Sequence, residues 1–151
     1  MMGFNPLRHN CETQGCFNKN RRPKIEVFAG CFPGAIAMAD IDGFVEIRGR
    51  FLYLEWKSPG APLHTAQRIS YTSLSRTTNS IVILCWGNAE SMDIGKMAVF
   101  VDGVRHDFSS PSLESAKLCM QAWATAAKEG RNATLGELMN ENLQPGFASQ
   151  V

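Results

Sequence analysis

The chain has 151 residues, of which 44% are hydrophobic and 19% are charged, and it carries 15 Lys and Arg against 14 Asp and Glu. That length suits one domain and can bury a core without a disulfide or a metal staple. The formal net charge of +1 excludes a strongly basic nucleic-acid coat or an acidic solvating tail as the whole function. No apolar run approaches the roughly 18–20 residues that a membrane helix needs.

The N-terminal residues also lack the apolar core of a signal peptide. The five cysteines are odd in number and irregularly spaced, so we expect most of them to be reduced thiols. We therefore expect a cytoplasmic protein with no membrane partner.

The chain opens with an irregular, basic segment. Residues 1–23 are rich in Asn, Gly and Pro, and with Lys24 they carry five basic side chains against the single acid Glu12. A basic arm attracts phosphates because each neutralised phosphate releases a counterion, although a merely solvated arm is the alternative. Residues 24–32 contain Ile25, Val27 and Phe28 and predict a first strand, which Pro33-Gly34 would close.

Two short segments rich in β-branched and aromatic residues follow and predict a strand pair. Residues 43–47 and 51–56 are separated only by residues 48–50, a spacing typical of a hairpin with a tight turn. Residues 58–62 (SPGAP) then interrupt regular structure. The apolar side chains of residues 65–75 recur at helical spacings, and we expect a short helix there.

The next segment is the most apolar of the chain. Residues 81–86 (IVILCW) are continuously hydrophobic, which is typical of a central strand covered on both faces. Residues 97–101 and 104–108 flank Asp102-Gly103, a strong hairpin signal.

The C-terminal part predicts two helices. Ser110 is expected to cap the first, with Pro111 at its first helical position. Apolar residues then recur at steps of three and four up to Glu129, so that one helix face points to the core; these are Leu113, Ala116, Met120, Trp123 and Ala127. Gly130 ends this helix, and Thr134 with Glu137 forms a capping box for a last short helix.

Together these elements predict an α/β fold in a single domain over residues 1–151. A basic arm (1–23) precedes a mixed central sheet with one helix (24–108), and C-terminal helices (110–143) flank the sheet.

The strand pair carries the side chains that could take part in catalysis or metal binding. Alternation along residues 51–57 places Glu55 and Lys57 on one face, opposite a Leu/Leu/Trp core face. If Arg48-Gly49 alone form the turn, Asp42 lies directly opposite Glu55, and Asp40 lies opposite Lys57. A three-residue turn without a bulge would instead put Asp42 and Glu55 on opposite faces.

The two-residue turn makes Asp42 and Glu55 a candidate metal site. Directly opposed side chains have Cβ atoms about 4.5–5.5 Å apart, and like charges at that separation are destabilising. A hard divalent cation such as Mg²⁺ or Mn²⁺ suits two carboxylates, with water or phosphate oxygens completing its shell. The alternative is that both acids lie at strand ends in water and hold no ligand.

The pattern D…E-x-K on adjacent strands resembles the active site of the PD-(D/E)xK nuclease superfamily and is most similar to its VRR-NUC branch of phage and repair nucleases. Asp42 matches the first acid, with Asp40 as its competitor, and Glu55-Trp56-Lys57 matches E-x-K. Residues 58–60 look like the turn that follows this motif in the family, and Gln67 matches the Gln that opens the next helix. The likeness covers residues 34–87 and implies a restriction-endonuclease-like core.

The resemblance also implies roles. Asp42 and Glu55 would hold one or two Mg²⁺ ions, with the Trp56 carbonyl as a further ligand and Asp40 as another candidate. Lys57 would orient or deprotonate the attacking water and stabilise developing charge. Gln67 would orient water or the DNA backbone, and many such nucleases act as homodimers.

A zinc site on the N-terminal arm is a separate hypothesis. His9, Cys11, Cys16 and Cys31 offer four ligands of the right chemistry, and zinc would order a segment that has little core of its own. Free thiols are the alternative.

The sequence thus predicts a small Mg²⁺-dependent DNA nuclease with catalytic residues Asp42, Glu55, Lys57 and Gln67. One alternative is a catalytically silent protein of nuclease fold, an accessory protein of a phage or mobile element that binds nucleic acid or a host factor. A third hypothesis is a plain interaction module in which Asp42 and Glu55 never meet.

Overall fold

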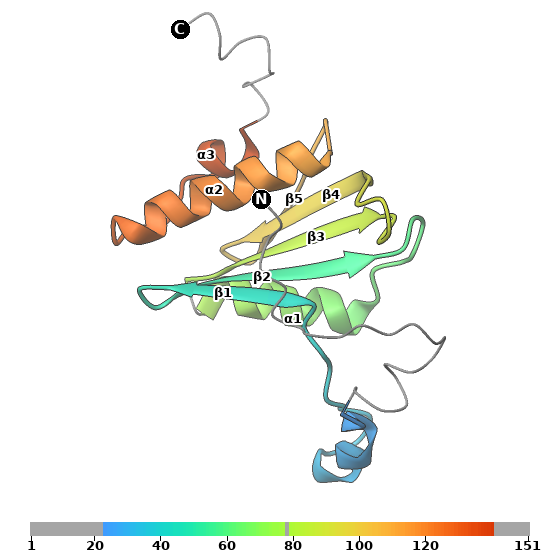
Figure 1. The fold of residues 1–151 in the computed structure, drawn as a ribbon. Helices are drawn as coiled ribbons and strands as arrows, with labels where there is room; N and C mark the ends of the chain where they lie inside the picture. Colours follow the sequence, from blue (N-terminus) through green and yellow to red (C-terminus); the bar gives the residue numbers. More distant parts are fainter. Residues whose placement is uncertain (1–22, 78, 141–151) are drawn as a thin grey trace, which may run out of the picture. The chain divides into compact units, whose positions relative to one another are not determined.

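The computed structural model describes residues 23–77 and 79–140 (Figure 1). The chain divides into two compact units, with the boundary between Asp40 and Ile41. No helix in the described ranges is long and apolar enough to cross a membrane.

The described part of the first unit contains a 3-10 helix, η2 (Ile25–Cys31), rather than the strand predicted for residues 24–32. None of its residues is buried, and among the described residues no strand precedes Gly43. A strand needs a neighbour to pair its backbone groups, so this segment makes local bonds instead, such as the one from Val27 N to the Lys24 carbonyl at 3.1 Å. The apolar residues Ile25, Val27 and Phe28 were a misleading strand signal.

The second unit is a mixed five-stranded sheet with helices on both faces. Its strands, in spatial as well as chain order, are β1 (Gly43–Ile47), β2 (Arg50–Lys57), β3 (Ile81–Gly87), β4 (Ile94–Val101) and β5 (Val104–Asp107). Only the β2–β3 pair is parallel, because α1 (Thr65–Thr77) carries the chain back across one face. α2 (Leu113–Lys128) and α3 (Leu135–Met139) cover the other face (Figure 1). The mixed α/β sheet flanked by helices, predicted from the sequence, is confirmed.

The core is centred on β3, all of whose residues are buried. On the α2 side, Ile83 and Cys85 pack with Trp123 and Cys119 of the helix. On the α1 side, Leu84 and Trp86 pack with further buried residues of β4 and α1. The continuous apolar run of residues 81–86 is therefore a central strand covered on both faces, as predicted.

Both hairpins turn through two residues. Arg48 and Gly49 have φ of 54° and 80°, and Asp102 and Gly103 have φ of 49° and 79°. Two successive left-handed residues are the signature of the tight turn that matches strand twist. Ile47 consequently pairs with Arg50, so the two-residue alternative for the first hairpin is correct.

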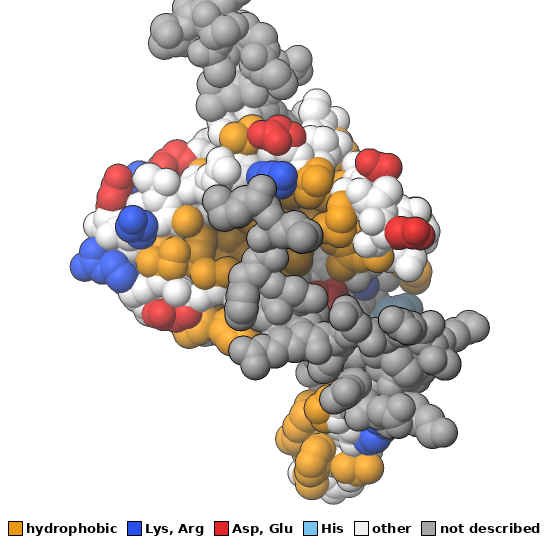
Figure 2. Space-filling model, viewed as in Figure 1, with side chains coloured by type: hydrophobic (Ala, Val, Ile, Leu, Met, Phe, Trp, Pro, Cys, Tyr) orange, Lys and Arg blue, Asp and Glu red, His pale blue; other side chains and the backbone are white. Residues whose placement is uncertain are grey.

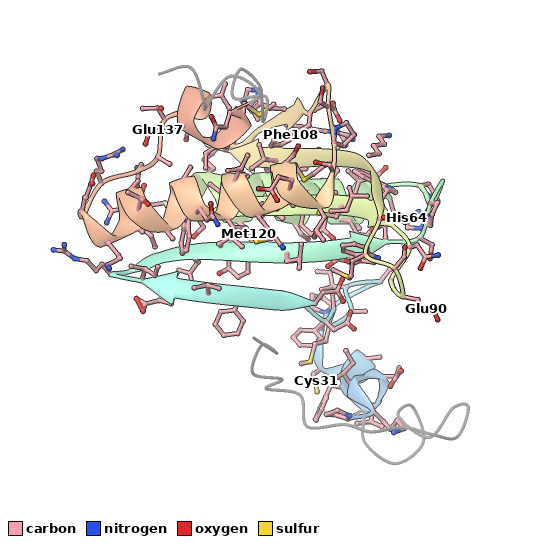
Figure 3. The ribbon with its side chains drawn as sticks, turned by 45° about the horizontal axis from the view of Figure 1, so that its top comes forward. Cys31, His64, Glu90, Phe108, Met120 and Glu137 are labelled. Carbon is pink, nitrogen blue, oxygen red and sulfur yellow. The ribbon has the colours of Figure 1, made fainter. Side chains whose placement is uncertain are left out.

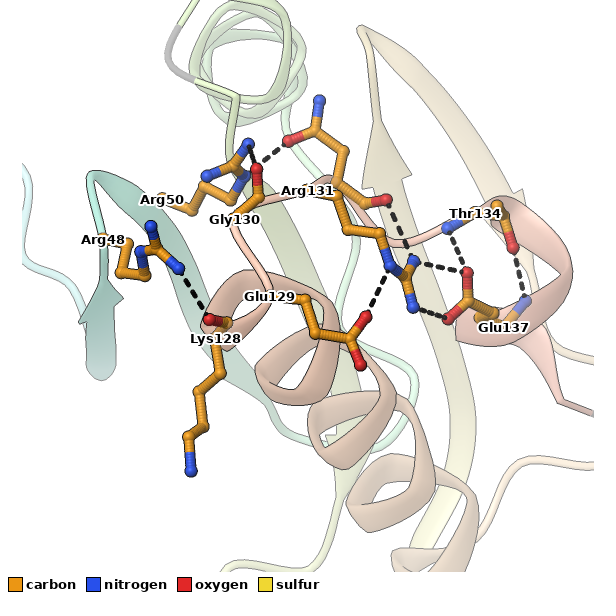
Figure 4. Close-up of polar contacts among 9 residues, drawn as sticks. Arg48, Arg50, Lys128, Glu129, Gly130, Arg131, Thr134 and Glu137 are labelled. Atoms are coloured by element: carbon orange, nitrogen blue, oxygen red, sulfur yellow. Dashed lines mark hydrogen bonds and ion pairs between the residues drawn. The ribbon is translucent and has the colours of Figure 1, made fainter.

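The first hairpin is fastened to the C-terminal end of α2 (Figure 4). Arg48 Nη1 donates to the Lys128 carbonyl at 2.8 Å, and Arg50 Nη2 donates to the Gly130 carbonyl at 2.9 Å. Carbonyls at a helix C-terminus lack intrahelical partners and carry partial negative charge. The two guanidinium groups donate hydrogen bonds to these carbonyls and bring positive charge to the helix end. These bonds fix the turn end of β1 and β2 against α2.

The N-cap of α2 differs from the sequence prediction, whereas that of α3 agrees with it. α2 begins after Ser112, whose hydroxyl oxygen accepts a bond from Ser115 N at 3.0 Å, and not after Ser110. Ser110 is instead held by its carbonyl, which accepts a bond from Ser115 Oγ at 2.7 Å. The predicted capping box of α3 is present: Thr134 and Glu137 exchange their two bonds at 3.1 Å each (Figure 4).

Strand β1 is an edge of the sheet and leaves apolar side chains exposed. Phe44 is 64% exposed and Val45 is 48% exposed. Val45 also lines an apolar hollow of about 250 Å³ with Met120 and Ala124 of α2. Figure 2 shows hydrophobic side chains at the surface on this side of the second unit.

Candidate active site

The register of the first hairpin brings Asp42 to the E-x-K segment. The printed pairing of β1 with β2 begins at Gly43 and Leu54, and Asp42 precedes that pair by one residue in a bend of the chain. Trp56 N donates to Asp42 Oδ2 at 2.6 Å. The exposed Asp42 is thereby held at the backbone of the central residue of Glu55-Trp56-Lys57.

Glu55 and Lys57 lie on the face of the sheet that α1 covers. In the parallel pairing Glu55 matches Leu84 and Lys57 matches Trp86, and both partners belong to the α1-side core. Glu55 is half-buried and Lys57 is only 8% exposed. The sequence placed both side chains on one face, which is correct.

Burial of the Lys57 ammonium has a local cause. The chain leaves β2 at Lys57, turns at Gly60, where φ is 76°, and returns to start α1. Ala61 N donates to the Ser58 carbonyl at 3.0 Å and closes this turn. An ammonium taken out of water needs polar partners, and Lys57 Nζ donates to Gln67 Oε1 at 2.9 Å.

Gln67 sits in the first turn of α1 and serves that helix as well. Its Oε1 accepts a longer bond, 3.4 Å, from His64 N, the amide just before the helix. This is the back-bond that a Gln at the third helical position makes in a capping box. Figure 3 shows His64 at the end of the sheet where β2 and β3 finish. One amide oxygen therefore links the end of β2 to the start of α1.

The structure does not place the other predicted side-chain ligands relative to this group. Asp40 is the last residue of the first unit, whereas Asp42, Glu55, Lys57 and Gln67 all belong to the second. Cys31 is an exposed free thiol in η2. The other three proposed zinc ligands, His9, Cys11 and Cys16, lie outside the described residues.

The donor set is that of a hard cation held by few protein ligands. Within residues 23–77 and 79–140 no group of three or more His, Cys, Asp or Glu side chains is placed to hold a metal. Asp42 and Glu55 supply two carboxylates, and one Asp42 oxygen is engaged with the Trp56 amide. Mg²⁺ commonly takes one or two protein carboxylates and fills its shell with water and phosphate oxygens, so the residues present fit it.

Sequence reasoning missed a cavity next to this group. It has a volume of about 730 Å³ and lies among residues 59–63 and the ends of β3 and β4, with Lys96 and Arg105 in its lining. The sequence analysis predicted a strand over residues 97–101, whereas β4 already starts at Ile94. Recognising that earlier start would have put Lys96 on the same face as Trp86, with which it pairs.

Comparison with known proteins gives no relative for this arrangement. No protein-family model matches the chain, and no curated protein or solved structure is significantly similar to it. The resemblance to PD-(D/E)xK nucleases therefore rests on the motif residues of the sequence alone.

Proposed function

We propose that the chain is a metal-dependent DNA nuclease of restriction-endonuclease-like fold that hydrolyses phosphodiester bonds at Asp42, Glu55 and Lys57. The register of the first hairpin supports the proposal, because Gly43 pairs with Leu54 and its continuation by one residue would bring Asp42 opposite Glu55. Lys57 follows two residues later on the same face of β2. Two acids and a cation around one strand end are what metal-assisted attack on a phosphodiester requires.

In this proposal Asp42 and Glu55 hold Mg²⁺, and the Trp56 carbonyl is a further ligand. The bound metal would polarise the scissile phosphate and lower the pKa of a coordinated water. The bond from Trp56 N to Asp42 Oδ2 leaves Oδ1 as the ligand oxygen and fixes how the carboxylate is turned. Asp42 is thus oriented before any metal arrives.

Lys57 acts on the charge that develops at the phosphate. Lys57 as a residue is 8% exposed, and a charge on a side chain so removed from water acts more strongly on a neighbour than one in bulk water. Gln67 holds that ammonium at 2.9 Å. We assign Gln67 as a positioning residue that acts through Lys57.

One observation favours the alternative of a silent, nucleic-acid-binding or host-factor-binding accessory protein. The Asp42 carboxylate already has a structural partner in the Trp56 amide, so this carboxylate is stabilised even without a metal. That alternative predicts DNA or protein binding that is unaffected by loss of Glu55, and no cleavage.

The proposal is tested with the purified full chain in two assays. Calorimetric titration with Mn²⁺ should show binding to the wild type and to Glu114→Gln, a control at an exposed acid of α2, but little to Glu55→Gln. Incubation with plasmid, branched and single-stranded DNA should show cleavage that EDTA abolishes. Absence of EDTA-sensitive cleavage of every substrate would refute the nuclease assignment.

A further inference from the structure

The cavity beside the candidate active site has the features of an anion-binding site. It opens on the α1 side of the sheet, and residues 59–63 form one wall. Lys96 and Arg105 bring two positive charges into its lining, against the single carboxylate of Asp93. The Asp93 carboxylate accepts a bond from Ser91 Oγ at 3.0 Å and remains charged. The two lining cations thus outnumber the one lining carboxylate, while Arg105 is also paired with Asp107 at 2.7 Å.

Both cations are held over one aromatic ring. Lys96 Nζ lies 4.7 Å and Arg105 Cζ lies 5.5 Å from the centroid of the Trp86 ring, within the roughly 6 Å range of a cation–π contact. The ring itself is fixed, because it is 3% exposed and Trp86 Nε1 donates to the Ala61 carbonyl at 2.7 Å. The fixed Trp86 ring thus holds two positively charged groups close to each other through cation–π contacts.

Arg105 is also oriented by the carboxylate of Asp107. Its Nε and Nη2 donate to Asp107 Oδ1 at 3.2 and 2.7 Å. A guanidinium has five N–H donors, so this pairing sets the plane of the group and leaves other N–H groups for a ligand. Lys96 is exposed and offers three donors.

The sheet register aligns this cavity with the candidate active site. Lys57 pairs with Trp86, and Trp86 pairs with Lys96, so the three side chains form a row on one face across β2, β3 and β4. Two strand spacings amount to about 10 Å. Along the axis of a nucleic-acid helix the phosphates of one strand recur about every 3.4 Å, so a span of this length parallel to the axis covers roughly three nucleotides.

We propose that Lys96 and Arg105, over Trp86, bind a backbone phosphate of the nucleic-acid strand whose scissile phosphate lies at Lys57. This inference rests on the proposed nuclease function and adds a second contact that positions the substrate. Phosphate is the chemical class that suits it, since a fixed guanidinium and an ammonium together offer several N–H donors to its oxygens. The purely structural alternative is that both side chains only cover the indole ring.

Binding can be measured apart from cleavage. Fluorescence anisotropy of a labelled oligothymidylate, with the full chain in EDTA, should show affinity about 3- to 10-fold lower for Lys96→Gln and for Arg105→Gln than for the wild type. The logarithm of the binding constant falls with the logarithm of salt concentration, and each substitution should make this slope shallower by about 0.7. That is the value for one phosphate contact on a single strand. Lys117→Gln, at an exposed lysine of α2, should bind as the wild type does.

The outcomes separate this inference from the nuclease proposal. Wild-type affinity and salt slope in both cavity variants, with thermal unfolding unchanged, would overturn the inference. Competition by inorganic phosphate or a nucleoside monophosphate as effective as by the oligomer would also overturn it, because the cavity would then serve a small phosphate. Dependence of binding on Lys96 and Arg105 in a protein that never cleaves DNA would sustain this contact and refute the nuclease proposal.

Discussion

Lys57 and Gln67 are joined by a hydrogen bond of 2.9 Å that links the last residue of β2 to the first turn of α1. The bond holds a cation at the end of the strand that carries Glu55, on a residue that is buried. The same Gln67 oxygen accepts from His64 N. Stability of the α1 start and position of the proposed catalytic cation therefore depend on one side chain.

Gln67→Leu should lower the free energy of unfolding by about 1–3 kcal/mol, because the buried ammonium loses an acceptor. Urea denaturation measures this. Arg68→Gln, at the next and exposed position of α1, serves as the control and should stay within about 0.5 kcal/mol of the wild type. A Gln67→Leu protein as stable as the wild type would show that the bond contributes nothing to the fold.

The turn of the first hairpin sets the register on which the site depends. Gly49 has φ of 80°, a conformation that costs a residue with a side chain about 1–2 kcal/mol. Gly49→Ala should therefore lower the free energy of unfolding by about that amount.

A second glycine, used as a matched control, should show a change in unfolding free energy of the opposite sign. Gly136 lies within α3, and a Cβ added there meets nothing within 4 Å. Gly136→Ala should raise stability by about 0.4–1 kcal/mol. Equal effects of the two substitutions in thermal or urea unfolding would contradict the left-handed assignment of Gly49.

A pH dependence is expected at the junction of α2 and α3. Hydrogen bonds from Arg131 and from Thr134 lower the pKa of Glu137 to about 2, from an ordinary 4.5. Because the folded-state pKa is depressed, the stabilisation is present above the unfolded value and is lost as the pH falls from about 4.5 through about 2.

NMR titration of the Glu137 carboxyl measures this directly. The wild type should titrate near pH 2, and Arg131→Gln should move the midpoint toward 4.5, since the Arg131 bonds are the largest cause of the shift. A wild-type midpoint near 4.5 would show that this ion pair does not persist in solution.

The cysteines should differ sharply in reactivity. Burial raises the pKa of both Cys85 and Cys119 to about 12, so little thiolate forms near neutral pH, whereas Cys31 is exposed. In a Cys11→Ser/Cys16→Ser background, native protein should react with a thiol reagent at Cys31 alone. Unfolded protein should react at all three, and fast native labelling of Cys85 would contradict its place in the core.

Local sequence signals were enough for the strands from residue 43 onward, while the turn of the first hairpin was left with two alternatives. The run at residues 81–86 identified the central strand, because full burial leaves a direct trace in residue type. Residues 24–32 were misread, since three apolar residues indicate a strand only where a neighbouring strand exists to pair with them.

The candidate site was predicted in part. Strand alternation put Glu55 and Lys57 on one face, as the sheet pairing has them, whereas Asp42 opposite Glu55 stays a prediction. The bond between Lys57 and Gln67 and the meeting of Lys96 and Arg105 over Trp86 were not predicted. Such contacts arise from tertiary folding and have no local pattern in the sequence.

The most direct test of the central claim is the rate of Mg²⁺-dependent DNA cleavage by Glu55→Gln, measured beside the wild type and the Glu114→Gln control. Loss of one of the two proposed metal-binding carboxylates should lower the rate by about 100-fold or more, while the circular dichroism spectrum stays that of the folded protein. Glu114→Gln should cleave as the wild type does. Cleavage by folded Glu55→Gln at the wild-type rate would contradict the account.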